Sequence, residues 1–444
     1  MSASSDRPAA LHPGQIARLR DRVDGEVAAP GEQGYDIGRE GFNTNIDHQP
    51  ALVVSARSTA DVRKAVEFGA AAGVPLAVQA TGHGAIAADG ALLIDTRRLN
   101  AVSVDPQRRT AHVAAGTRRH DAVDAAARHG LAPLNGTALS VGVVGYTLGR
   151  GLSPLGRAFG FACDHVRFAE LVTADGSVRR VSPDSDPDLL WALRGAKGNL
   201  GIVTELEFGL FPVPSIYGGG LYFPGELADK ALAVWSAWAA AAPQAATSSF
   251  ALLRLPAAPV FPEPLRGTVS VHLRIAYLGN QQQGESLVEP LRAIGAPLID
   301  TLAEMPYPSI GTVFAVNGNS PARAPYHDRS VLLNDLPDAA ARTLLDTAGP
   351  DTHCPLLIVE LRHLGGALDR TSPDTSPIST HDAQFLLSST GVGGMEHADR
   401  FKAYQAALAH AMAPWASGRA ALNFLSGDQT AAGLEPQAYS VSLL

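Results

Sequence analysis

The stretch Val78-Gln79-Ala80-Thr81-Gly82-His83-Gly84-Ala85 places a histidine between two glycines at the end of an apolar run. Residues 75–79 before it are predicted to form a strand, and Leu92-Leu93-Ile94-Asp95 after it another, so the histidine lies in a loop between two strands. Glycine lets backbone N–H groups approach a ligand closely, and an imidazole ring is a nucleophile. The loop therefore offers both bare backbone and a reactive ring.

The segments around this loop alternate between strands and helices. Leu52-Val53-Val54 is a short apolar strand, and the helix after it begins at Ser58 and ends at Gly73, which are typical capping residues. Further elements are expected as hairpins over residues 101–115 and 166–181, helices over 119–128 and 186–194, and a strand over 205–211. This half of the chain is predicted to be an α+β domain.

Two further stretches are rich in glycine. Residues 135–160 contain Gly136, Gly142, Gly145 and Gly149, and residues 195–203 run directly into a strand. With the His83 loop, these stretches could cradle a pyrophosphate, because successive backbone N–H groups form a nest for anions. Any one of them alone is more simply an ordinary turn. A Rossmann site is the competing hypothesis, but no GxGxxG opens a helix after the first strand.

The second half of the chain begins after Pro212-Val213-Pro214. Strands are predicted over 268–277, 356–364 and 421–425, and helices over 226–241 and 398–413, which favours an antiparallel sheet with helices on one side. We expect three regions: residues 1–211 as a ligand-binding domain, residues 212–395 as a second domain that forms the substrate wall, and residues 396–444 as a segment that returns to the first domain.

Composition limits the classes of partner. The chain has 444 residues, a formal net charge of −8 and no run of Lys or Arg, so we expect a small-molecule substrate and neither nucleic acid nor membrane. Cys163 and Cys354 are far apart, and no zinc motif is present, so reduced thiols and no metal are expected. The N-terminus lacks the pattern of a signal peptide, which favours a cytoplasmic protein.

Several ordered motifs resemble the berberine-bridge-type FAD-linked oxidases, which have a PCMH-type FAD-binding domain and are similar to vanillyl-alcohol oxidase. The resemblance runs from about residue 45 to about residue 428. It rests on Gln79-Ala80-Thr81-Gly82-His83-Gly84, Val141-Gly142-Val143-Val144-Gly145-Tyr146-Thr147-Leu148-Gly149-Arg150-Gly151, Gly195-Ala196-Lys197-Gly198-Asn199-Leu200-Gly201-Ile202-Val203-Thr204, Glu360-Leu361-Arg362-His363-Leu364-Gly365-Gly366-Ala367 and Asn423-Phe424.

The resemblance implies an FAD domain built from the N-terminal half plus a C-terminal return, with the flavin between it and the antiparallel sheet. It also implies that His83 bonds the flavin covalently. Ala138 stands where some members have a second, cysteine tether, so a single bond is expected. The cofactor-binding residues implied are Gln79, Ala80, Thr81, Gly82, His83, Gly84, Gly136, Thr137, Ser140, Val141, Gly142, Gly145, Tyr146, Gly149, Gly198, Asn199, Gly201, Val203, Asn423 and Phe424.

The general base is not evident. Members of the family often have Tyr where this chain has Phe424, which has no proton to exchange. The candidates are Tyr146, Glu360, Arg362 and His363. Because side chains alternate along a strand, Glu360 and Arg362 should share a face and His363 should take the other. A structural salt bridge between Glu360 and Arg362 is the simpler interpretation.

The leading hypothesis is a covalently flavinylated oxidase that takes hydride from a small organic substrate in secondary-metabolite tailoring and reduces O2 to H2O2, as a monomer or homodimer. A flavin-retaining cyclase or lyase without net redox, and a ligand-binding protein with a degenerate flavin site, are the alternatives. The family's usual closing motif is missing after Gly427, so the end of the chain is expected to be shortened or divergent.

Overall fold

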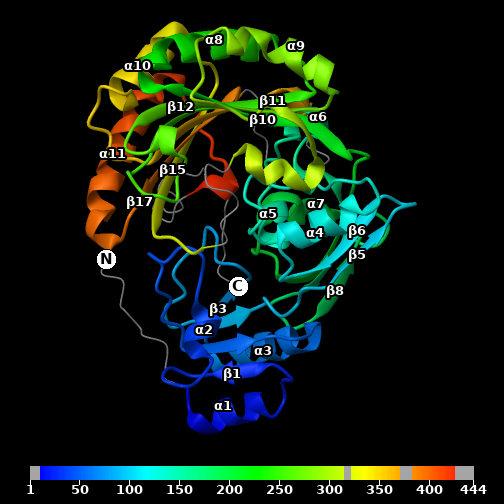
Figure 1. The fold of residues 1–444 in the computed structure, drawn as a ribbon. Coiled ribbons are helices and arrows are strands. Elements are labelled where there is room, and N and C mark those ends of the chain that lie inside the picture. Colours follow the sequence, from blue (N-terminus) through cyan, green and yellow to red (C-terminus); the bar gives the residue numbers. More distant parts are fainter. Residues whose placement is uncertain (1–10, 315–321, 371–382, 426–444) are drawn as a thin grey trace.

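A computed structural model describes residues 11–314, 322–370 and 383–425, which form three sheets with helices packed against them (Figure 1). The divergent end expected beyond Gly427 lies outside these residues. Within the described ranges, no helix combines the length and apolar character needed to span a membrane.

The first sheet is small and contains the strand that leads into the His83 loop. Its order is β1-β2-β4-β3, and β2, β4 and β3 run parallel. The strands are β1 Glu26–Ala28, β2 Leu52–Ser55, β3 Leu76–Gln79 and β4 Leu92–Asp95, and the helices are α1 Pro13–Arg20, α2 Tyr35–Arg39 and α3 Thr59–Ala72. The predicted caps of α3 are confirmed: the Ser58 side chain accepts from Asp61 N–H, and Gly73 is left-handed.

The second sheet lies beside the first. Its order is β5-β6-β9-β7-β8, all antiparallel. The strands are β5 Val102–Asp105, β6 Thr110–Ala114, β7 Val166–Val172, β8 Val178–Val181 and β9 Ile202–Gly209, and the helical elements are α4 Arg119–Ala127, α5 Val143–Leu148, α6 Gly156–Phe159, η1 Ala162–His165 and α7 Pro187–Ala196. The apolar cluster under it joins β6, β7 and β9 to α4, α5 and α7, as the predicted α+β class requires.

The third sheet has eight antiparallel strands. Its order is β13-β10-β12-β11-β16-β17-β15, with β14 also paired to β10. The strands are β10 Ser215–Pro224, β11 Ala246–Arg254, β12 Val269–Tyr277, β13 Ile299–Asp300, β14 Ala303–Pro306, β15 Tyr326–Leu333, β16 Ile358–His363 and β17 Phe385–Val392. The helices are α8 Ala228–Ala241, α9 Gln281–Arg292, α10 Asp338–Ala348 and α11 Ala398–Ala411, and the short helical turns are η2 Gly225–Leu227, η3 Glu263–Leu265, η4 Tyr307–Val313, η5 Gly366–Arg370, η6 Met395–His397, η7 Ala413–Trp415 and η8 Leu422–Phe424.

Helices α8 to α11 cover the outer face of this sheet (Figure 1), which confirms the predicted antiparallel sheet with helices on one side. Trp235 of α8 and Phe401 of α11 belong to the same buried cluster as Phe250 of β11. The opposite face of the sheet is turned toward the first two sheets, and several charged side chains lie on it.

The described part of the C-terminal region includes a helix and a short turn. Helix α11 packs against α10 and β15, in the helical layer of the third sheet. The turn η8 bonds to Tyr146 and Lys197 of the first half of the chain. The predicted strand over residues 421–425 is the turn η8, which joins none of the three sheets. The polar groups of this turn bond to the second glycine-rich loop through the Asn423 side chain, and to β15 through the Phe424 carbonyl, which accepts from Ser330.

Candidate functional site

The His83 loop is held by the segment just after α2. Gly82 has a φ of +70°, and a Cβ there would lie 2.4 Å from Gly41 Cα, so only glycine fits this close approach of two backbones. The Phe42 N–H donates to the Thr81 carbonyl at 2.9 Å. The imidazole of His83 stacks on the Phe42 ring, with centroids 3.7 Å apart and planes inclined by 15°. The ring is therefore fixed in orientation.

His83 also contacts the second glycine-rich loop. Its Nδ1 lies 3.0 Å from Thr81 Oγ1 and its Nε2 lies 3.5 Å from Ser140 Oγ. Thr81 Oγ1 in turn accepts from Gly142 N–H at 3.3 Å. Burial, with a smaller contribution from Arg118, lowers the pKa of His83 to about 4. The ring is therefore neutral at physiological pH, which is the form that acts as a nucleophile.

The turn η8 contacts both the second loop and the third loop. The Asn423 side chain donates to the Tyr146 carbonyl at 2.8 Å, and Lys197 Nζ donates to the Leu422 carbonyl at 3.0 Å. A Cβ on Gly149 would fall 1.9 Å from Asn423 Oδ1, so the loops and the turn touch through bare backbone. Burial lowers the pKa of Lys197 to about 8. The structure thus brings all three glycine loops together with Asn423.

A cavity of about 220 Å³ lies between these loops and the third sheet. Charged and hydroxyl side chains of four strands line it, together with one residue of the second loop and one of η8. The lining residues are Thr137, Arg274, Phe314, Asp328, Arg329, Ser330, Ile358, Glu360, Arg362, Ser388, Thr390 and Phe424.

Glu360 is the centre of a buried ion-pair network on this wall. Its Oε1 accepts from Arg274 Nη1 at 2.7 Å, and its Oε2 pairs with Arg362 Nη2 at 2.9 Å. The side chains of Glu360 and Arg274 are only 4% and 3% exposed. Burial raises the pKa of Glu360, but the guanidinium groups of Arg362 and Arg274 outweigh it and hold the pKa at about 2. Both oxygens are occupied, so the predicted salt bridge is confirmed.

His363 lies on the other face of β16, as the alternation predicted. Its Nε2 accepts from Arg157 Nη1 at 2.8 Å, and its ring stacks near Phe385. Burial and then the charge of Arg157 lower the pKa of His363 to about 3. The structure does not bring this residue to the cavity.

Tyr146 is also absent from the cavity wall. Its ring lies under the Arg119 guanidinium, at 3.9 Å from the centroid, and a Cβ on Gly136 or Gly151 would lie 2.7 Å from a ring carbon. Burial raises the pKa of the Tyr146 hydroxyl well above its ordinary value. The geometry is that of a packed side chain, which keeps its proton at physiological pH.

Asp328 is a cavity residue that the sequence analysis missed. Thr390 Oγ1 donates to its Oδ1 at 2.6 Å. Burial raises the pKa of Asp328 to about 6, although the hydrogen bond from Thr390 and the charge of Arg362 act in the opposite direction. The alternation of Tyr326, Asp328 and Ser330 before a buried apolar run was the available signal for a strand with a polar face.

The remaining residues of the predicted cofactor set lie in different surroundings. Thr137 and Phe424 line the cavity. Gly84, Gly145, Gly198 and Asn199 are exposed at the loop surfaces, whereas Ala80, Ser140 and Val141 are partly buried. Gln79 is buried and bonds to His48 and to the Glu40 carbonyl. Val203 is paired with Leu171 inside the second sheet, and Gly201 packs against the Val172 carbonyl.

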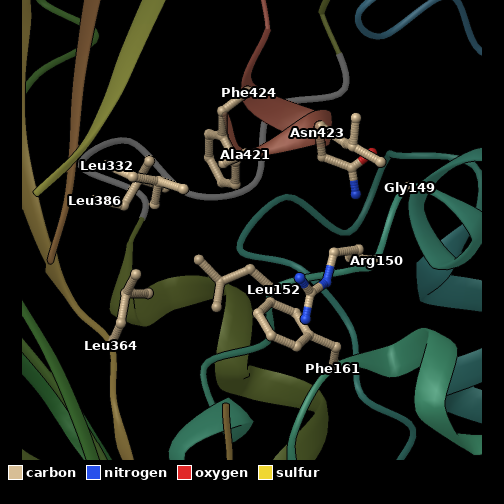
Figure 2. A pocket seen from close by; sticks show the side chains of 11 residues that line it. Gly149, Arg150, Leu152, Phe161, Leu332, Leu364, Leu386, Ala421, Asn423 and Phe424 are labelled. Carbon is tan, nitrogen blue, oxygen red and sulfur yellow. The ribbon is translucent and has the colours of Figure 1, made fainter. Parts of the chain in front are cut away.

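A much smaller cavity of about 30 Å³ lies behind η8 (Figure 2). Leu152, Leu332, Leu364 and Leu386 surround it, and the Phe424 ring faces these leucines. Its walls are mostly apolar, and Phe424 is one of the residues that line it. It is far smaller than the cavity of about 220 Å³, which is therefore the better candidate for a substrate site.

Known proteins are similar to this chain in sequence and in fold. Residues 50–182 match the family described as an FAD binding domain. The chain is 30% identical to (R)-6-hydroxynicotine oxidase of Paenarthrobacter nicotinovorans over 308 residues. The matched part is 67% of this chain and 64% of that protein, so the chain spans slightly less than two thirds of this relative's length. It is 35% identical to glucooligosaccharide oxidase of Sarocladium strictum over 200 residues, 44% of this chain and 40% of that protein.

The fold is that of BBE-like 1 from Physcomitrella patens, with a TM-score of 0.81 at 20% identity, covering 93% of this chain and 92% of that one.

Proposed function

We propose that this chain is an FAD-linked oxidoreductase. In this proposal it is an oxidase that uses FAD to oxidise a small organic substrate and passes the electrons to O2, giving H2O2. The relatives that carry the names (R)-6-hydroxynicotine oxidase and glucooligosaccharide oxidase support this reaction type. We place the reaction in the tailoring of secondary metabolites.

The residues present fit a flavin dinucleotide. A Cβ on Gly84, Gly145 or Gly198 would meet no described atom within 4 Å other than those of adjacent residues or of the same helix, so these backbones border open space. Such bare backbone suits a pyrophosphate. The cavity of about 220 Å³ adjoins the second loop through Thr137 and the turn η8 through Phe424. The three glycine loops, Asn423 and these two residues would hold the cofactor.

The proposal includes a single covalent bond through His83. The observation that carries it is a neutral imidazole, stacked on Phe42, between two glycines and against the second loop. Ala138 has no nucleophilic atom to provide a second bond.

FAD, when bound, supplies an acceptor for a hydride and a route for two electrons to O2. The chain supplies orientation and a proton acceptor. Glu360 stays ionised and paired to Arg274 and Arg362, so it fixes the direction of both guanidinium groups toward the cavity and exchanges no proton. Phe424 closes one side with an apolar ring, which excludes water from the reacting atoms.

The cofactor and its linkage are tested together by the absorption spectrum of purified protein before and after acid precipitation. The wild-type pellet should stay yellow. The variant His83→Ala should release its flavin into the supernatant or be isolated without flavin. As a matched control, His120→Ala removes a half-exposed histidine on α4 and should keep the coloured pellet. A yellow pellet from His83→Ala would show that the covalent assignment is wrong.

The oxidase reaction is tested separately by anaerobic mixing with candidate substrates, followed by measurement of H2O2 after air is admitted. Bleaching of the flavin and one peroxide per substrate are expected. Turnover without bleaching or peroxide would refute an oxidase.

A further inference from the structure

We propose that Asp328 is the proton acceptor of this enzyme, and that the substrate gives it a proton from a hydroxyl or amine group next to the carbon that is oxidised. The inference rests on the oxidase function proposed above. The four candidates from the sequence fit this role less well. Glu360 and Arg362 are ion-paired with each other, and Tyr146 and His363 do not line the cavity.

The position of Asp328 on β15 supports this role. Side chains two residues apart on a strand share a face. On that face, the Tyr326 hydroxyl accepts from Gly84 N–H at 3.4 Å, and the Ser330 hydroxyl donates to the Phe424 carbonyl at 2.8 Å. Asp328 therefore lies between a contact to the His83 loop and a contact to η8, which are the two ends of the candidate flavin site.

The carboxylate of Asp328 is available for a proton. Its Oδ1 accepts from Thr390, and within the described part of the chain Oδ2 makes no hydrogen bond. Glu360 differs, because its two oxygens are occupied by Arg274 and Arg362. A base has to keep an oxygen for the substrate, and among the described residues that line the cavity, which include two carboxylates, only Asp328 meets this condition.

The groups around Asp328 and its burial together set the pKa of this carboxylate. The charged and titratable groups around it are Glu360 and Arg362 of β16, Arg274 of β12, and Arg329 and Tyr326 of β15. Arg274, Glu360 and Arg362 together carry one net positive charge, which favours the ionised form. Burial opposes it more strongly, so the pKa of Asp328 is about 6, and the group is mostly ionised at neutral pH while remaining basic enough to accept a proton.

The step balances without a further reactant. The O–H or N–H bond of the substrate breaks and its proton moves to the Asp328 carboxylate. The electron pair left behind forms the C=O or C=N bond as hydride leaves the carbon. When FAD is bound, it would accept the hydride with its two electrons, and O2 would take these electrons with two protons: the one that came with the hydride and the one that Asp328 returns.

The test compares the holoenzyme with Asp328→Asn, which keeps the shape and the contact to Thr390 but cannot take the proton. Flavin content is measured first, to verify folding. Anaerobic flavin reduction is then followed with 6-hydroxynicotine and with a glucooligosaccharide. The wild-type rate should rise with pH through about 6. In Asp328→Asn it should be lower by about 10²–10⁴-fold and independent of pH. Asp351→Asn, which alters an exposed loop aspartate, should behave as wild type.

A second pair of variants separates the proposed role from a structural one. Thr390→Val removes the hydrogen bond that lowers the pKa of Asp328, so the midpoint of the pH profile should move upward. Thr390→Ser should restore it. A structural role for Asp328 would leave the midpoint of Thr390→Val unchanged, which would overturn the proposal.

The remaining outcomes are also decisive. If Asp328→Asn reduces its flavin as fast as wild type with the same pH profile, the inference is wrong while the oxidase function stands. If neither compound bleaches the wild type, the flavin spectrum of the resting holoenzyme is titrated with pH. A spectral shift centred near pH 6 that Asp328→Asn lacks supports the inference, and the same shift in both proteins overturns it.

Discussion

Replacing Glu360 with glutamine removes the carboxylate that pairs with two guanidinium groups on the cavity wall. Glutamine keeps the shape and one acceptor oxygen, so the change isolates the charge. The pKa of Glu360 falls from an ordinary 4.5 to about 2 because of Arg362 and Arg274, despite burial. At about 1.4 kcal/mol per pH unit, this difference stabilises the folded state by about 3 kcal/mol. Removing one partner of a buried ion pair costs a similar 3–5 kcal/mol, roughly.

The expected result for Glu360→Gln is therefore a loss of about 3 kcal/mol in the free energy of unfolding at neutral pH. Urea unfolding followed by tryptophan fluorescence measures it, since Trp235 and Trp238 lie in the core of the third sheet. A carboxyl group whose pKa is lower in the folded state stabilises the fold fully at pH values above its pKa in the unfolded chain. This stabilisation is lost as the pH falls through the pKa of the folded state. The gap between wild type and variant should be constant above pH 4.5 and should shrink below it.

A surface ion pair serves as the control. Glu26→Gln breaks the contact of Glu26 with Arg98, in which both side chains are about half exposed, and should cost less than about 1 kcal/mol. If Glu360→Gln costs no more than this control, the pairing of Glu360 with two buried cations does not stabilise the sheet, and the reasoning from burial and charge is refuted.

Two further predictions concern single contacts. Gly82→Ala should destabilise the protein by more than about 2 kcal/mol and reduce its flavin content, because the new Cβ would lie 2.4 Å from Gly41 Cα. Gly84 has a similar φ of +61° but open space beside it, so Gly84→Ala should lower the free energy of unfolding by only about 1 kcal/mol. Thermal unfolding of both variants checks this, and equal losses would contradict it. Tyr307→Phe removes the hydroxyl that donates to the Pro133 carbonyl at 2.6 Å and should lower the free energy of unfolding by about 1–3 kcal/mol in urea; a change within experimental error would contradict the assignment of that bond.

Local signals in the sequence predicted much of the fold. The apolar runs of β2, β3 and β4, and the caps Ser58 and Gly73 of α3, act within a few residues, so they are legible without tertiary information. The same holds for the opposite facing of Glu360 and His363, which follows from the geometry of any strand. The predicted strand at residues 421–425 was wrong, because a short apolar run is compatible with several conformations and tertiary contacts selected the turn.

What the sequence determined by itself is the inventory of the site: three glycine-rich loops, a histidine between two glycines, and a strand that carries Glu360 and Arg362 on one face. Only the tertiary structure decided how these parts meet. Strand β15 pairs with β17, and β17 with β16, although β15 precedes both in the chain, and this order places Asp328 beside Thr390 and opposite the glycine loops. Pairing between distant strands depends on which faces can be buried together across the whole sheet, and no short stretch of sequence contains that information.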